Sequence, residues 1–146
     1  MKEIKIEIPK QAIMTEVALA SSYAGAKSRE TADFDTVATV KEDEAFLQRF
    51  WNDTCGEIAS VLQEFVAVAL FSGESLKLEL ELSGAYDEAL TPSVEADIFS
   101  ALSAGVTARW FRFTLPEKAP EWETRSRDLL ERAHRKLCYR RKPLKS

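Results

Sequence analysis

Leucine alternates with charged residues between positions 76 and 82, and this feature constrains the fold more than any other. A spacing of two predicts a strand with one buried side and one solvent-facing side. A second alternation, of isoleucine with charge, runs from 4 to 8 and stops at Pro9. If the two strands pair, Lys5 and Glu7 are expected to face the charges of the leucine strand. Two strands alone are marginally stable, so this sheet must rest on helices or be extended by strands from a second copy.

Four segments carry apolar residues at the spacing of three and four that predicts helices. They cover residues 10–27, 43–71, 92–115 and 120–141. Pro92 and Pro120 stand where a first helical turn tolerates proline, and Gly73 and Pro116 stand where a helix ends. The order is therefore strand, two helices, strand, two helices. This order predicts an α+β fold that is mostly helical, with four helices packed on a small two-stranded sheet.

The end of the second predicted helix, 65–71, is apolar on every side. Such a surface is either covered all round or offered to another chain, and we expect it at the centre of the core. It is also the longest apolar run, and a bilayer needs about 20 such residues. The N-terminus has no apolar segment typical of a signal peptide. We therefore expect a soluble protein without membrane contact, in the cytoplasm or, if the chain is phage-derived, in the virion.

Charge is divided unevenly along the chain. Residues 1–108 carry 8 Lys/Arg and 19 Asp/Glu, a net charge of -11, whereas residues 109–146 carry 12 and 5, a net charge of +7. Such asymmetry indicates contact with nucleic acid, a membrane surface or an acidic partner. Because the acidic part belongs to the same chain, the basic part can also neutralise it, either within one molecule or between copies. The length fits a single domain over 1–146, with a basic tail from about 139.

Few residues stand in a pattern typical of catalysis or metal binding. His134 and Cys138 are four apart on one predicted helix, a spacing that lets two ligands face one ion. Two ligands do not make a site, and Cys55 is the only other thiol, so we expect a surface histidine and free cysteines. Asp33 and Asp35 are interpreted as solvated loop residues, and none of the five glycines lies in a phosphate-binding loop. We therefore expect no enzyme activity, no cofactor and no metal.

Two groups of residues are candidates for contact with a partner. Trp110, Phe111 and Phe113 follow each other too closely on one helix to face the same side. One of the two phenylalanines must therefore meet a second element or a partner. The other group is a cluster of cations that suits phosphate or an acidic protein surface, although the helix dipole alone also favours cations at a helix C-terminus. Its members are Arg135, Lys136, Arg140, Arg141 and Lys142.

The sequence around these two groups resembles the C-terminal part of small helical proteins encoded in bacterial prophage structural modules, which build heads, necks and tails. The likeness lies in the stretch 108–122, with its Trp helix and proline break, and in the stretch 129–141, which ends in Leu-Cys-Tyr-Arg-Arg. It covers roughly a quarter of the chain. The resemblance implies a virion or tail component and brings no catalytic residues with it.

Together these observations predict a non-enzymatic assembly or interaction protein whose partners are further copies of itself or other structural proteins. An acidic surface on one copy would meet the basic helical tail of the next. Apolar surface from the 43–71 helix or from the Trp110 region would supply most of the affinity. Such head-to-tail contacts generate rings or filaments. The alternative is a small regulatory module that binds nucleic acid through its basic C-terminal helix, which the acidic remainder of the chain disfavours.

Overall fold

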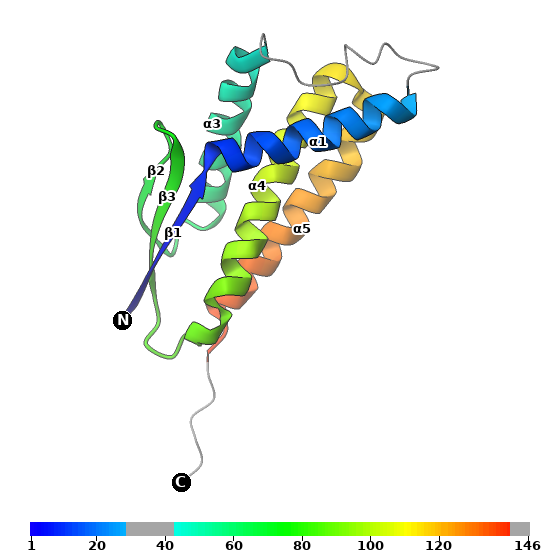
Figure 1. Ribbon diagram of the computed structural model, residues 1–146. Coiled ribbons are helices and arrows are strands. Elements are labelled where there is room, and N and C mark those ends of the chain that lie inside the picture. The colour runs from blue at the N-terminus through cyan, green and yellow to red at the C-terminus, as the bar shows by residue number, and fades with distance from the viewer. Residues whose placement is uncertain (29–42, 141–146) are drawn as a thin grey trace.

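The computed structural model describes residues 1–28 and 43–140, with side chains for 1–22 and 43–140. Figure 1 shows a small sheet at one side of a larger group of helices, which is the expected α+β, mostly helical arrangement. The helices within these residues are α1 (Lys10–Ser28), α3 (Glu44–Val61), α4 (Thr91–Thr114) and α5 (Ala119–Cys138). The strands are β1 (Lys2–Pro9), β2 (Val66–Leu70) and β3 (Ser75–Leu82).

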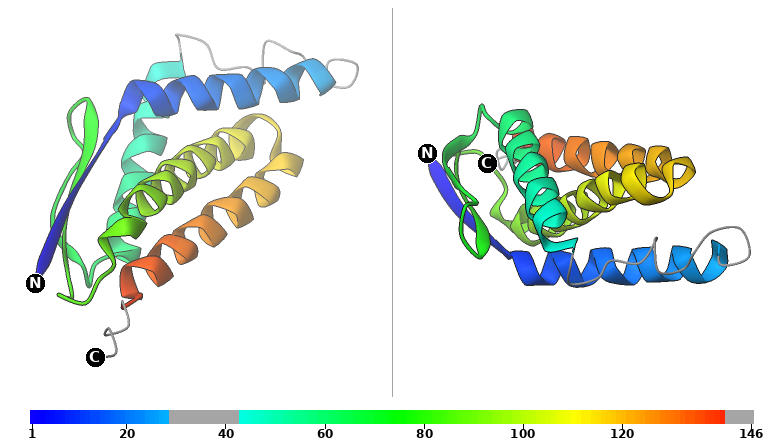
Figure 2. Two further views of the ribbon diagram at one scale, coloured as in Figure 1. Left: turned by 60° about the horizontal axis from the view of Figure 1, so that its bottom comes forward. Right: turned by 90° about the horizontal axis from the view of Figure 1, so that it is seen from above.

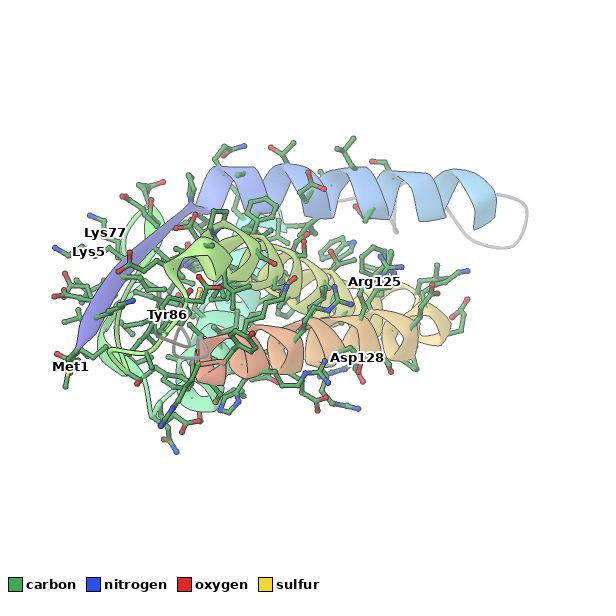
Figure 3. The ribbon with its side chains drawn as sticks, turned by 90° about the horizontal axis from the view of Figure 1, so that it is seen from below. Met1, Lys5, Lys77, Tyr86, Arg125 and Asp128 are labelled. Carbon is green, nitrogen blue, oxygen red and sulfur yellow. The ribbon has the colours of Figure 1, made fainter. Side chains whose placement is uncertain are left out.

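The sheet is antiparallel in the order β1-β3-β2, so β3 lies in its middle. Ile6 lies opposite Leu78 and Lys5 lies opposite Glu79, which confirms the predicted pairing of the two alternating segments. The apolar side chains of this pairing face the helices. Figure 3 shows Lys5 and Lys77 pointing away from the helices, on the outer face of the sheet. Alternation in the sequence thus gives a sheet with one covered face and one charged face.

The second helix is shorter than predicted. α3 ends at Val61, and the predicted continuation to 71 is instead a turn followed by β2, which pairs with β3. The sheet therefore has three strands among the described residues, and β2 lies at its edge rather than at the centre of the core. Short apolar runs do not distinguish a buried helix from a strand, and the valines of 66–70 favour the strand. The indole Nε1 of Trp51 donates to the carbonyl oxygen of Phe71 at 3.0 Å, which ties the end of this strand to α3.

Helix α4 is at the centre of the core because it packs against α1, α3 and α5. Figure 2 shows α4 and α5 side by side and antiparallel, with α1 crossing over α4. The apolar residues that recur every four positions along α4 are almost fully buried, as their spacing predicts. They are Val94, Ile98, Leu102, Val106 and Trp110. No helix in the described parts of the chain has the length and apolar character needed to cross a membrane.

Candidate functional site

The aromatic candidates divide between the core and the surface. Trp110 and Phe111 are each 1% exposed, so neither can contact a partner directly, and the prediction that they do so is wrong. Phe113, two residues further along α4, is 59% exposed. Its ring stacks on that of Phe46 from α3, with ring centroids 5.0 Å apart. Phe113 is therefore the aromatic residue that turns away from the core and meets a second element, as the spacing requires.

Phe113 belongs to a larger surface that we call the aromatic patch. Phe46, the other exposed ring, is 44% exposed, and the half-buried Phe50 lies one turn further along α3. These rings line a shallow hollow of about 400 Å³ together with Arg49, Asp53, Arg109 and Arg112. Arg109 and Arg112 pair with Glu57 and Glu123 from outside the hollow, so the three arginines and three carboxylates here carry no net charge, and Arg49 is the arginine of the rim without an ion pair among the described residues.

A second apolar surface lies on the edge strand β2, and we call it the sheet patch. Val68 is 36% exposed and Leu70 is 58% exposed. Both lie opposite charged residues of β3, Glu79 and Lys77, and so belong to the outer face of the sheet. The charged residues on this face are Glu3, Lys5, Glu7, Lys77, Glu79 and Glu81, four carboxylates and two amines. The sheet patch is therefore an apolar edge beside an acidic face.

The basic cluster contributes less free charge than its sequence suggests. The ammonium group of Lys136 lies 2.6 Å from Oδ2 of Asp97, a carboxylate that is 6% exposed, and 2.5 Å from Oγ of Ser93. Lys136 therefore neutralises a buried acid of its own molecule and is not available to a partner, which corrects its prediction as an interaction residue. Arg132 approaches the same carboxylate at 3.9 Å.

Other members of the basic cluster have different surroundings. Arg135 and Arg140 are exposed, and neither forms an ion pair with another residue in the described ranges. Arg140 lies beyond the end of α5 and forms an isolated antiparallel bridge with Tyr86. Arg141 and Lys142, like the loop aspartates Asp33 and Asp35, lie outside the residues that the structure describes.

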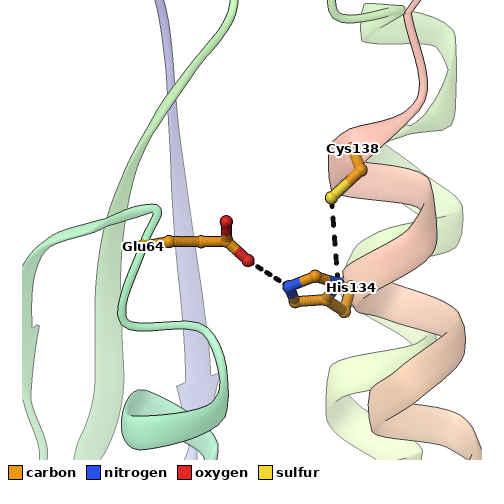
Figure 4. Close-up of side chains that lie close together, drawn as sticks. All are labelled: Glu64, His134 and Cys138. Atoms are coloured by element: carbon orange, nitrogen blue, oxygen red, sulfur yellow. Dashed lines mark hydrogen bonds and ion pairs between the residues drawn. The ribbon is translucent and has the colours of Figure 1, made fainter.

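A cluster of chemically active side chains lies at the end of α5, and sequence reasoning recognised only two of its three members. His134 and Cys138 are one turn apart on α5, as predicted, and Figure 4 shows Glu64 reaching them from the opposite side. The Glu64 carboxylate contacts Nε2 of His134, and Sγ of Cys138 lies 3.8 Å from Nδ1 of the same ring. Glu64 is 70 residues from His134 in sequence, so no local spacing could have indicated it.

Packing positions the members of this cluster. The ring of Phe65 packs against that of His134 with centroids 5.4 Å apart, and Phe65 follows Glu64 in the turn between α3 and β2. Burial raises the pKa of the Cys138 thiol, the nearby Glu64 carboxylate raises it further, and Arg140 lowers it in part. The thiol is therefore protonated at neutral pH, which disfavours a role as a thiolate nucleophile.

The second cysteine has a different environment. Cys55 is fully buried in α3, and the two cysteines are not joined, as expected. Desolvation raises the pKa of the Cys55 thiol to about 12, with Lys10 opposing this in part. Cys55 is a packing residue.

An open groove of about 870 Å³ separates α1 from the hairpin of α4 and α5. Its apolar lining includes Leu19, Phe99, Trp122 and Leu129. The guanidinium of Arg125 lies over the Trp122 ring, 4.3 Å from its centroid, and covers this aromatic surface in part.

Comparisons with protein families, with curated proteins and with solved structures find no match to this chain. The resemblance to prophage structural proteins therefore stays a prediction, and the function has to be argued from the surfaces themselves.

Proposed function

We propose that the protein is a non-enzymatic assembly protein that associates head to tail, with the aromatic patch of one copy on the sheet patch of the next. The observation that carries this proposal is the exposure of two separate apolar surfaces, of which one borders Arg49, an exposed cation with no ion pair among the described residues, and the other borders an acidic face. One lies on α3 and α4 among arginines, and the other lies on β2 beside an acidic face. Different surfaces that bind each other make a heterologous contact, which produces rings or filaments.

The aromatic patch has the composition of a binding hot spot. Aromatic and arginine side chains concentrate binding energy at the centre of interfaces, where they become fully desolvated. Phe113 and Phe46 already stack on each other, so little side-chain freedom remains to be lost on binding. Arg49 lies beside these rings and can reach a carboxylate of a partner, whereas Arg112 is paired with Glu123 of its own molecule.

The sheet patch offers a partner both apolar contact and backbone groups. β2 is an edge strand, so half of its peptide groups have no neighbour within the sheet. Natural proteins usually protect such an edge with charge or proline, whereas 66–70 contains neither. The aromatic patch lies on helices and cannot pair with this edge as a strand, so the proposed contact uses the exposed side chains of Val68 and Leu70.

The sequence predicts that the C-terminal tail supplies the positive charge of the interface. The pairing of Lys136 with Asp97 removes one member of that tail, and Arg49 of the aromatic patch takes its place. We propose a virion or tail assembly of prophage origin as the biological setting, in which the partner is a second copy or another structural protein. Rings of repeated subunits are the structures that head-to-tail contacts build most simply.

Light scattering coupled to size exclusion tests this proposal. The mass of the wild-type protein should increase with concentration. Phe113→Arg and Leu70→Glu should each weaken association at least about 30-fold, the loss of one hot-spot residue of about 2 kcal/mol. Glu131→Arg, an exposed substitution on α5, should leave association unchanged. A wild-type protein that stays monomeric at high concentration contradicts self-assembly.

Mixing the two defective variants distinguishes a heterologous contact from a symmetric one. The Phe113→Arg variant retains its sheet patch and the Leu70→Glu variant retains its aromatic patch, so an equal mixture should form dimers of one copy each. If each patch bound only its own kind, the mixture would contain homodimers of each variant, and the head-to-tail arrangement would be wrong.

The alternative function, nucleic-acid binding through the basic helix, keeps only Arg135 and Arg140 as exposed cations of the predicted cluster within the described residues. Phosphate binding by several cations weakens steeply with added salt. Gel retardation of duplex DNA that disappears between low and moderate salt, and also in Arg135→Glu, would favour this alternative over assembly.

A further inference from the structure

The cluster of Glu64, His134 and Cys138 brings three kinds of metal ligand to one point on the surface (Figure 4). His134 and Cys138 share one face of α5 because residues four apart on a helix are neighbours. The turn between α3 and β2 carries Glu64, and this turn is held by backbone hydrogen bonds. Phe65 N–H donates to Leu62 O at 2.9 Å, and Glu81 N–H donates to Phe65 O at 2.8 Å.

One distance in this cluster matches that between two ligands of a tetrahedral metal ion. Zinc bonds of about 2.3 Å to sulfur and about 2.0 Å to nitrogen separate the two ligand atoms by about 3.6 Å. Sγ of Cys138 and Nδ1 of His134 are 3.8 Å apart. One ligand atom from each of the three residues can be chosen so that all lie within 4.8 Å of one another. An ion therefore fits between the sulfur and the nitrogen without movement of the helix.

We propose that Cys138 Sγ, His134 Nδ1 and the Glu64 carboxylate bind one Zn²⁺ ion, or a similar borderline divalent transition metal, with a fourth position open to water. Thiolate, imidazole and carboxylate together are a donor set that zinc accepts and that magnesium and calcium do not. The metal displaces the thiol proton, which passes to solvent, and no electron transfer is involved.

Only one side chain has to rearrange. The Glu64 carboxylate contacts Nε2, on the side of the ring away from the sulfur, and must turn toward Nδ1 to become a ligand. The Glu64 side chain is 57% exposed, so little packing opposes this movement. Phe65 meanwhile holds the imidazole ring, whose side chain is 33% exposed, in place. Two of the three ligands are thus in place before the metal arrives.

Titration of the full-length, chelator-treated protein with Co²⁺ and then Zn²⁺ tests the site. Co²⁺ should give the visible absorption bands of tetrahedral coordination and a near-ultraviolet thiolate-to-cobalt band, at one ion per chain. Zn²⁺ should displace it. Cys138→Ser should abolish the thiolate band, and both Cys138→Ser and His134→Ala should weaken Zn²⁺ binding at least about 100-fold. Glu64→Gln should weaken it about 10-fold or more.

The controls use the other cysteine and the proposed assembly surface. Cys55→Ala should retain the thiolate band and the stoichiometry, because that thiol is buried in the core. Phe113→Arg should also retain them, so the site can stand even if the assembly proposal fails. Binding that survives Cys138→Ser unchanged, a cobalt spectrum without a thiolate band, or one ion shared by two chains would each overturn the proposal.

Discussion

The two cysteines lie in regions that use the same side chain in opposite ways. Cys55 is sealed between α3 and the rest of the core, and its thiol has a pKa of about 12 because water is excluded. Cys138 is exposed at the end of α5, beside an imidazole and a carboxylate. The comparison shows that burial, and not residue type, separates the thiol that serves packing from the thiol that a ligand can reach.

The sealed region depends on a close approach between α3, α4 and α5. A Cβ at Gly105 of α4 would lie 2.6 Å from Cγ2 of Thr54 and 3.1 Å from Oγ of Ser126. Thr54 is held there because its hydroxyl donates to Phe50 O and accepts from Arg109. Glu64, in the open region, contacts His134 with a side chain that is 57% exposed.

The two regions should differ most in the free energy of unfolding that is lost when a large side chain is removed. Trp110→Ala empties a site that is 1% exposed and should lower the free energy of unfolding by about 3–5 kcal/mol. His134→Ala, in the open cluster, should lower it by about 0.5 kcal/mol or less, because its contacts are at the surface. Urea denaturation of the metal-free proteins measures both. Equal losses would show that the end of α5 is part of the core after all.

The two thiols should contribute differently to the pH dependence of stability. An unfolded thiol ionises near pH 9, whereas buried Cys55 stays neutral until its pKa of about 12. The contribution of the neutral Cys55 thiol to the free energy of unfolding is fully present below pH 9. It is lost as the pH rises toward 12, since unfolding then releases a proton. The loss is up to about 1.4 kcal/mol per pH unit, or about 2 kcal/mol between pH 9 and 10.5.

Comparison of the wild-type protein with Cys55→Ala measures this slope and removes the contributions of other alkaline groups. Cys138→Ala is the matched control and should change the slope much less, because its thiol is exposed. If Cys55→Ala had the same alkaline slope as the wild type, Cys55 would not be sealed from water.

The smallest expected effects come from two helical glycines, and they should differ in sign. Gly105→Ala should lower the free energy of unfolding by about 1–2 kcal/mol, since overpacking outweighs the gain in helix propensity. Gly56→Ala should raise it by up to about 1 kcal/mol, because nothing lies within 4 Å of a Cβ there. Thermal or urea denaturation gives both values. A stabilised Gly105→Ala would mean that α3 and α4 can move apart at little cost.

Periodicity predicted those parts of the molecule in which one face alone is buried. The alternation at 4–8 and 76–82 gave the strands and their cross-strand partners, and the spacing of four along α4 gave its buried face. In each case the side that a residue faces follows from its position within a single element. Tertiary contacts then add burial without changing which side faces inward.

Other features could not be predicted because a distant segment determines them. The apolar residues of 66–70 fit a helix or a strand equally well until β3 offers a pairing edge. Lys136 looked like a free cation because Asp97, its partner, is 39 residues away. Glu64 lies in a turn after α3, whereas the sequence predicted that the helix continues through this position, so its contact with His134 was not expected. The strand at 66–70, the pairing of Lys136 and the position of Glu64 all depend on contacts between elements that are distant in sequence.

The pairing of β1 with β3 has a consequence for how the chain is made. Lys2 at the start of β1 pairs with Leu82 at the end of β3. On a ribosome that adds about 5–20 residues per second, Ile4 of β1 is synthesised about 4–15 s before its partner Leu80. Helices can form during that interval from local contacts alone, whereas the first strand has to wait. A chaperone that recognises alternating isoleucines therefore has several seconds in which to hold β1 of the nascent chain.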